Sequence, residues 1–586
     1  MASRSVKALA AVLTLVSETW AQSANETVWS SFAYLQYGER TPLQGTLAPG
    51  LTPLGAQQLY TQGSLFRARY LSSNSSLSDE NNTMTTNSPI NGIEQAALDN
   101  SQLAMYSTTD DYVVGGALAF LQGLYPPVTR TFAADNGGEN ASLLADGTTV
   151  EYPLDGYQYP NILSTPITDL SSVWLEGHSS CAEYWVSSND FRSSSIGQEM
   201  YSSTLDFYET TFLEVFPNTL ANSMLNFDYA YDLYDYAKYA YGHDSSVQEA
   251  LNVDRLAILR SLANNQQFDL NGNLSASGSQ EGDMIRAISG RTLAAKVVAQ
   301  LSAHIHSAGT TNKMTLMFGS FEPMLAFFAL SDLSNTASSD LFREIPLPGS
   351  AMVFELFSTV NDTTYPTEDQ FWIRFLYRNG TDSDEPLTEY PLFGRGNSET
   401  RMKWTDFQDS IAQFSIQDLS TWCDICGSVT LFCSSLSQDS DTSSDSANSS
   451  NGSNTNSSLS PAVAGVIGAV TAIAALSLAG MTAFVFGGVR LRRRGPSDAD
   501  RRRSSPGGFK GAENMASDHD VSIAKTGARH ERVGSWELGG PGSIKAPQPT
   551  AVPENVSSGV FGASIRRDGD ADSVVGAQPV DPIERV

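Results

Sequence analysis

The side chains with the clearest chemical potential follow one short apolar run. Residues Phe32–Leu35 suit a buried β-strand, and the loop after them carries a phenol at Tyr37, a carboxylate at Glu39 and a guanidinium at Arg40. A guanidinium binds phosphate or carboxylate through paired N–H groups. A phenol with a pKa near 10 is neutral in acid and attacks a substrate only when a base activates it. The loop therefore predicts a binding or hydrolytic site at the end of a strand.

This loop, within Phe32–Pro42, resembles the Arg-His-Gly-x-Arg-x-Pro signature of the histidine acid phosphatases, which include the fungal phytases. Further stretches resemble the fungal branch of that family in the same order, namely 28–31, 40–43, 51–60, 118–127, 288–293, 354–356 and 373–380. Together they cover nearly all of residues 28–433, and the resemblance implies the family's fold.

The resemblance also implies a cationic site. In the family a His attacks phosphorus, three Arg and a second His neutralise the phosphoryl oxygens, and an Asp protonates the leaving alcohol. The matching positions in this chain are Gln36 and Tyr37 (first Arg and nucleophilic His), Arg40 and Tyr112 (second and third Arg), and Phe321 and Glu322 (second His and Asp). Only Arg40 and the carboxylate of Glu322 keep the family's chemistry, so four of these six roles fall to neutral side chains.

Because phosphoryl transfer depends on positioning and on cations, such losses should cost several powers of ten in rate. We therefore expect a catalytically inactive member with a binding or interaction role. Its cleft is expected to be lined by Tyr37, Tyr112 and Phe321, and to bind a small ligand, a sugar or a phosphate ester, through Arg40, Tyr37 and Glu322. No cofactor and no metal are expected.

Two alternatives stay open. One is a weak acid phosphomonoester hydrolase that uses Arg40 and Glu322 with a non-standard nucleophile, such as Tyr37 activated by Glu39 or Glu322. The other is a structural cell-surface glycoprotein with no ligand in the cleft. The remaining histidines of the expected ectodomain are His178, His243, His304 and His306. For the last two, a loop or core position is favoured over a metal site.

The spacing of apolar residues predicts an α/β fold with a mixed sheet covered by helices. Residues 22–130 and 285–433 are assigned to the α/β domain, and 131–284 to a mostly helical insertion. Further strands are expected at Met314–Phe318, Met352–Phe357 and Phe371–Tyr377. One helix is expected to start at Thr52 and Pro53 and to run towards Tyr70, and another to occupy residues near 283–303. The aromatic stretch Phe227–Tyr236 is interpreted as packing between helices.

The two ends of the chain predict a type I membrane protein. Residues 1–21 have the pattern of a signal peptide. Residues 462–489 form an uncharged run of 28, long enough to cross a bilayer. We assign 461–489 to a transmembrane helix, 434–460 to a disordered stalk rich in Ser, Asn and Asp, and 490–586 to a disordered cytoplasmic tail, because Arg490 and further arginines follow the span. The ectodomain is expected at the cell surface or in the vacuole. Gly465 and Gly468 would permit a homodimer through the span.

The expected ectodomain is strongly acidic. Residues 22–460 hold 18 Lys and Arg against 50 Asp and Glu, a net charge of 18 − 50 = −32. Such a surface repels nucleic acid, so no nucleic-acid partner is expected. Four cysteines (Cys181, Cys423, Cys426 and Cys433) predict two disulfides without deciding their pairing. Glycosylation sequons begin at Asn25, Asn74, Asn81, Asn140, Asn273, Asn361, Asn379, Asn448, Asn451 and Asn456.

Overall fold

A mixed β-sheet forms the centre of the protein. The computed structural model describes residues 26–46, 48–72, 85–336, 338–359 and 364–441. The strands are β1 (Thr27–Gln36), β2 (Leu103–Thr108), β3 (Ile162–Thr165), β4 (Met314–Gly319), β5 (Ala351–Ser358), β6 (Phe371–Arg378), β7 (Thr388–Tyr390) and β8 (Arg401–Lys403). Their order is β3-β2-β4-β1-β5-β6-β7, and β8 also pairs with β6. The first four strands in this order are parallel and the others antiparallel, which confirms the predicted mixed α/β class.

The helices include the two that the sequence predicts, one from Pro53 and one near residues 283–303. They are α1 (Pro53–Phe66), α2 (Asp111–Leu124), α3 (Gly138–Ser142), α4 (Pro153–Gly156), α5 (Val173–Glu176), α6 (Ala182–Ser193), α7 (Ser195–Val215), α8 (Ala230–His243), α9 (Ser245–Leu251), α10 (Val253–Asn271), α11 (Ile288–His306), α12 (Glu322–Leu330), α13 (Ser339–Arg343), α14 (Trp404–Ala412), α15 (Leu419–Cys426) and α16 (Leu431–Asp441). The predicted N-cap of α1 is present, because the Thr52 side chain accepts from the Gly55 N–H.

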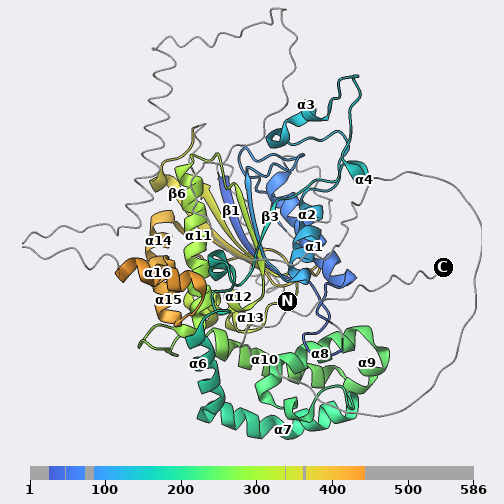
Figure 1. The fold of residues 1–586 in the computed structure, drawn as a ribbon, viewed down its shortest axis with the longest axis vertical. Helices are drawn as coiled ribbons and strands as arrows, with labels where there is room; N and C mark the ends of the chain where they lie inside the picture. The colour runs from blue at the N-terminus through green and yellow to red at the C-terminus, as the bar shows by residue number, and fades with distance from the viewer. Residues whose placement is uncertain (1–25, 47, 73–84, 337, 360–363, 442–586) are drawn as a thin grey trace, which may run out of the picture. The chain divides into compact units, whose positions relative to one another are not determined.

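Helices cover both faces of the sheet (Figure 1). On one face, α1 and α2 pack on β1, β2 and β4, and glycines set their close approach. A Cβ at Gly63 would lie 1.9 Å from the Phe120 carbonyl oxygen, and a Cβ at Gly123 would lie 2.1 Å from that of Tyr60. On the other face, α11, α12 and α14 bury Phe32 and Phe354. Both faces of β1 are therefore buried, which explains its near-continuous apolar sequence.

The segment 131–284 contains α3 to α10, and it also contributes a strand to the central sheet. Its β3 pairs in parallel with β2 from Met105 to Thr108. Beyond β3, helices α6 to α10 gather at one end of the sheet (Figure 1). Phe227 and Leu233 are buried in a core shared with β1, which supports the packing role expected for this stretch.

Two disulfides hold the C-terminal helices. Cys181 is bonded to Cys426, and Cys423 to Cys433, so the structure decides a pairing that the sequence left open. The predicted stalk is wrong at its beginning, because α16 continues to Asp441 and residues 434–441 are therefore helical. The covalent anchor at Cys433 holds this helix against α15.

The predicted signal peptide, transmembrane helix and cytoplasmic tail lie outside the described residues. Within the part of the chain that is described, none of the helices is both long and apolar enough to span a membrane. Of the ten sequons, only those at Asn140, Asn273 and Asn379 fall in described segments. Asn140 is exposed, whereas the Asn379 side-chain oxygen accepts bonds from the Leu347 N–H and the Tyr377 hydroxyl.

Candidate functional site

Parallel strand ends bring the predicted site positions to one edge of the sheet. In the pairing of β1 with β4, Gln36 lies opposite Gly319, and the Tyr37 N–H donates to the Gly319 carbonyl oxygen at 3.1 Å. Phe321 and Glu322 follow β4 directly, at the start of α12. Tyr112 lies in the first turn of α2, after the neighbouring strand β2. The six positions therefore converge at the carboxyl ends of three adjacent strands.

The sequence resemblance assigns Tyr37 to the position of the family's nucleophile. It is 7% exposed, and its ring packs edge-on against Tyr112 with 4.9 Å between centroids. Its hydroxyl lies 3.3 Å from the hydroxyl of Tyr231, a residue of α8. Burial raises the pKa of Tyr37 above its ordinary value, although the Arg40 guanidinium acts in the opposite direction. This phenol is therefore held neutral, and a neutral phenol is a poor nucleophile.

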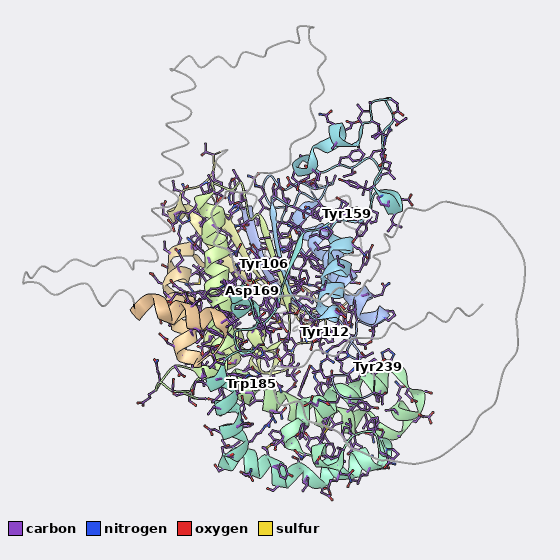
Figure 2. All side chains as sticks on the ribbon, viewed as in Figure 1. Tyr106, Tyr112, Tyr159, Asp169, Trp185 and Tyr239 are labelled. Carbon is purple, nitrogen blue, oxygen red and sulfur yellow. A yellow bond between two sulfur atoms is a disulfide. The ribbon has the colours of Figure 1, made fainter. Side chains whose placement is uncertain are left out.

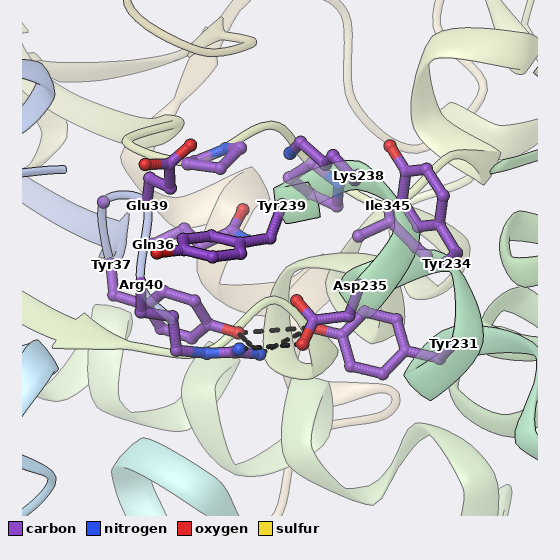
Figure 3. Close-up of a pocket in the computed structure, with 13 residues that line it drawn as sticks. Gln36, Tyr37, Glu39, Arg40, Tyr231, Tyr234, Asp235, Lys238, Tyr239 and Ile345 are labelled. Carbon is purple, nitrogen blue, oxygen red and sulfur yellow. Dashed lines mark hydrogen bonds and ion pairs between the residues drawn. The ribbon is translucent and has the colours of Figure 1, made fainter. Parts of the chain in front are cut away.

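Arg40 is enclosed and neutralised by residues of the helical segment (Figure 3). Its Nη1 forms an ion pair with Asp235 at 2.9 Å. Its Nη2 donates to the hydroxyls of Tyr37 (3.3 Å) and Tyr231 (3.2 Å). The guanidinium also lies over the rings of Tyr37 and Tyr112, at 5.2 and 5.5 Å from their centroids.

The local electrostatics keep Arg40 charged. Burial alone lowers the pKa of Arg40, but the hydroxyls of Tyr37 and Tyr231 and the Asp235 carboxylate reverse this and leave the pKa above its ordinary value. Among the described residues, only the Nε of the three Arg40 guanidinium nitrogens is without a hydrogen-bond partner. The guanidinium that the family uses for phosphate is thus already occupied by a carboxylate of this chain.

Gln36 has a structural role in the same loop. With its amide nitrogen turned towards the segment before β5, it donates to the carbonyl oxygens of Pro346 (3.0 Å) and Leu347 (3.1 Å). It is 3% exposed. Gln36 thus pins the loop that leads into β5 and does not present a cation to the cleft.

A small cavity opens above Tyr37 and Arg40. Its volume is about 50 Å³, well below the roughly 300–1,000 Å³ of common small-molecule pockets. Its lining is drawn in Figure 3 and consists of Gln36, Tyr37, Gly38, Glu39, Arg40, Tyr231, Tyr234, Asp235, Lys238, Tyr239, Ile345, Pro346 and Pro348. Tyr112 and Phe321 do not line this cavity: Tyr112 packs against Tyr37, and Phe321 packs against Tyr231, with ring centroids 5.0 Å apart.

Glu322 belongs to a buried polar cluster close enough to the cavity for its charge to add to the raised pKa of Tyr37. It does not line the cavity, and its Oε2 is buried without a hydrogen-bond partner in the described structure. Burial raises the pKa of Glu176 to about 7, the hydroxyl of Ser179 opposes this shift, and the charge of Glu322 adds to it. Burial lowers the pKa of His178, while Glu322 acts in the opposite direction. The structure thus places His178 and Glu176 near Glu322, which the sequence did not indicate.

The cavity residues that sequence reasoning missed include three on α8. Tyr231, Asp235 and Lys238 are spaced by four and three residues, so they share one helix face, and that face points at the β1 loop. This spacing was the available signal, but the surrounding aromatic residues were interpreted only as packing. The lysine of this group has a pKa lowered by burial to about 8.

The model of one protein family matches most of the folded part. The histidine phosphatase superfamily (branch 2) matches residues 17–378. The chain therefore belongs to the histidine phosphatase superfamily, as its motifs predicted. No curated protein matches the chain.

Several solved structures match the chain at low identity. A phytase from Citrobacter braakii is 13% identical, with a TM-score of 0.41, over 67% of this chain and 98% of that one. A Klebsiella phytase is 8% identical, with a TM-score of 0.43, over 67% and 97%. A Bifidobacterium longum multiple inositol polyphosphate phosphatase, in complex with inositol hexasulfate, is 12% identical, with a TM-score of 0.41, over 69% and 96%.

Proposed function

We propose that this protein is a catalytically inactive member of the histidine phosphatase superfamily whose cleft has a binding or interaction role. The observation that supports this most directly is the ion pair between Arg40 and Asp235. The same guanidinium also donates hydrogen bonds to the hydroxyls of Tyr37 and Tyr231. A phosphate dianion would have to displace the Asp235 carboxylate to reach the guanidinium. No imidazole stands at position 37 to accept the phosphoryl group.

The charge of the cavity favours a neutral ligand. Its lining holds two cations, Arg40 and Lys238, and two carboxylates, Glu39 and Asp235, so its formal charge is zero. Four tyrosines (Tyr37, Tyr231, Tyr234 and Tyr239) supply aromatic surface and hydroxyls. Such a lining suits a hydroxyl-bearing neutral group, such as the end of a sugar, better than a phosphate ester.

The expected placement of the chain belongs to the same proposal. A signal peptide over 1–21, a span over 461–489 and sequons such as the exposed Asn140 fit a glycoprotein anchored at the cell surface with its tail in the cytoplasm. Protease treatment of intact cells should remove the ectodomain and leave the tail. Treatment with a glycosidase specific for N-linked glycans should increase electrophoretic mobility. A tail degraded in intact cells would contradict this topology.

Enzyme assays test the inactive cleft directly. Full-length protein and its Tyr37→Phe variant are incubated with p-nitrophenyl phosphate and with phytate between about pH 3 and pH 7. We expect turnover at the buffer rate in both, because removing even one electrostatic contact to a transition state costs roughly 10²–10³ in rate. An active phytase under the same conditions is the positive control.

The assay also distinguishes the alternatives. Activity that disappears in Tyr37→Phe would overturn the proposal and make Tyr37 a nucleophile. Activity retained in that variant would point to a weak acid hydrolase with another nucleophile. The buried cluster of Glu176, His178 and Glu322 favours this second candidate, since Glu176 would hold a proton near neutral pH. His178→Ala and Glu176→Gln should then abolish the activity.

A further inference from the structure

A second cavity lies between α5 and α11. Its volume is about 360 Å³, and it is lined by Trp174, Ala295, Lys296, Val298, Ala299 and Gln417. Most of this lining is apolar, with one ammonium and one amide. It shares no lining residue with the cavity above Tyr37. Its volume falls in the range of small-molecule sites, roughly 300–1,000 Å³.

Lys296 is a half-buried cation without a counterion. Its Nζ forms neither an ion pair nor a hydrogen bond with any described residue. The ammonium lies over the ring of Tyr106, 4.6 Å from the centroid. Burial lowers the pKa of Lys296, and no neighbouring carboxylate opposes that shift. Of the other described lysines, Lys313 and Lys403 donate to backbone carbonyl oxygens, whereas the ammonium of Lys296 has only the Tyr106 ring beside it.

The carboxylates nearest in sequence to this lining accept hydrogen bonds from other groups, and Glu176, two residues after Trp174, accepts from the hydroxyl of Ser179. Asp169 accepts hydrogen bonds from the N–H and hydroxyl of Ser171, and Asp418 accepts from the N–H and hydroxyl of Thr421. Both therefore cap local turns. The positive charge of Lys296 is left for a group from outside the described chain.

Apolar surface continues from Lys296 along the edge of the sheet. Tyr106 on β2 lies opposite Leu163 on the edge strand β3, so the two side chains are neighbours on one face. Leu163 is 54% exposed, because α11 does not cover this edge. Figure 2 shows Tyr106 beside α11 and Asp169 just below it. An apolar surface thus adjoins a single unpaired cation.

We propose that this cavity binds a small amphiphilic anion, with its acidic group on Lys296 and its apolar body against Trp174 and Val298. An anion would be complementary in charge to Lys296, which has no carboxylate partner among the described residues. The rest of the ligand would cover apolar side chains that are otherwise partly in water. The site is independent of the cleft at Tyr37 and Arg40 and of whether that cleft has activity.

Calorimetric titration of the full-length protein tests the proposal. The probe is 4-phenylbutyrate, and the uncharged probe 4-phenylbutyramide has nearly the same shape. We expect saturable binding of the acid. The affinity for the amide should be lower by at least about tenfold, because a hydrogen bond to a charged group changes affinity by that factor. Lys296→Met should weaken the acid about tenfold and leave the amide unchanged. Lys296→Arg should retain binding of the acid.

Matched variants separate this site from other surfaces. Trp174→Ala should weaken acid and amide alike. Lys313→Met is the control, since Lys313 is another lysine without an ion pair and its Nζ donates to the Asn91 carbonyl oxygen. If Lys296→Met alters thermal unfolding, Lys296→Gln replaces it. Absence of saturable binding, equal binding of both probes, or equal effects of the Lys296 and Lys313 variants would overturn the proposal.

Discussion

At the scale of single residues, the cleft differs from a phosphatase site chiefly in what surrounds its one arginine. Four positions with neutral side chains remove cations, and Asp235 then neutralises the guanidinium that remains. The side chain of Arg40 is 2% exposed, so solvent does little to weaken this pair. The inactivity that we propose thus has two causes, missing groups and an internal competitor for the anion.

Asp235→Asn should turn the cleft back towards anion binding. The variant leaves Arg40 buried without a counterion, so we expect a lower melting temperature together with a rise in that temperature on adding sodium phosphate or sulfate. The affinity for phosphate should exceed that of the natural protein by about tenfold. Thermal unfolding across a phosphate titration measures both effects.

Asp232→Asn is the matched control for this experiment. Asp232 lies on the same helix and accepts from Gln44 at 3.3 Å, without an ion pair to Arg40. Its substitution should leave the phosphate response unchanged. If neither variant responds to phosphate, or if both respond equally, the Asp235 carboxylate is not what blocks the cleft.

At the scale of elements, a buried ionic network joins the end of α1 to β5 and β6. The carboxylate of Glu355 accepts from Arg69 and Tyr70 at 2.5 Å each and from Arg374 at 2.5 Å. The chain after α1 takes a wider, π-helical turn over Arg67–Leu71, and this turn contains both Arg69 and Tyr70. Burial acts against the ionised carboxylate, but Arg374 and Arg69 outweigh it and hold the pKa of Glu355 well below its usual range.

Glu355→Gln should destabilise the protein by about 3–5 kcal/mol at neutral pH, because buried Arg69 loses its only carboxylate partner among the described residues and Arg374 keeps only Glu26 and Glu389. Since the folded-state pKa of Glu355 is depressed, its contribution is present above the unfolded glutamate value of about 4.3 and is lost as the pH falls towards the folded-state pKa. The deficit of the variant should therefore shrink in acid. Urea unfolding at several pH values measures it.

The control for this prediction is the exposed pair of Glu214 with Arg255. The side chain of Glu214 is 58% exposed, and its carboxylate lies 2.9 Å from Arg255. Glu214→Gln should change stability by less than about 1 kcal/mol at any pH. A Glu355 variant as mild as the Glu214 variant would show that the network contributes little net stability.

At the scale of the whole molecule, the two disulfides should differ in their contribution. Cys181–Cys426 closes a separation of 245 residues and ties the segment before α6 to α15, whereas Cys423–Cys433 closes a separation of 10. In the loop-entropy account, the longer loop should stabilise the protein by about 2–3 kcal/mol more. Unfolding in urea of the paired variants Cys181→Ser with Cys426→Ser and Cys423→Ser with Cys433→Ser compares them. Equal losses would contradict the loop-length argument.

The sequence by itself determined the features that depend on local chemistry. Pro53 after Thr52 starts α1 because a proline needs no N–H partner at that position and a threonine side chain can accept one. The apolar run Phe32–Leu35 could only be a buried strand or helix, and the glycine-containing loop after it favoured a strand. The motifs in series also predicted the superfamily that the family model shows.

Only the tertiary structure decided which residues from distant parts of the sequence contact each other. Arg40 and Asp235 are 195 residues apart, so the ion pair that neutralises the arginine of the cleft leaves no trace in either local segment. Tyr231 serves the cleft because α8 places it against Tyr37, while the same aromatic pattern elsewhere on that helix serves the core. Pairing of charges and cysteines depends on distances in space, and those follow from the packing of the insertion on the sheet.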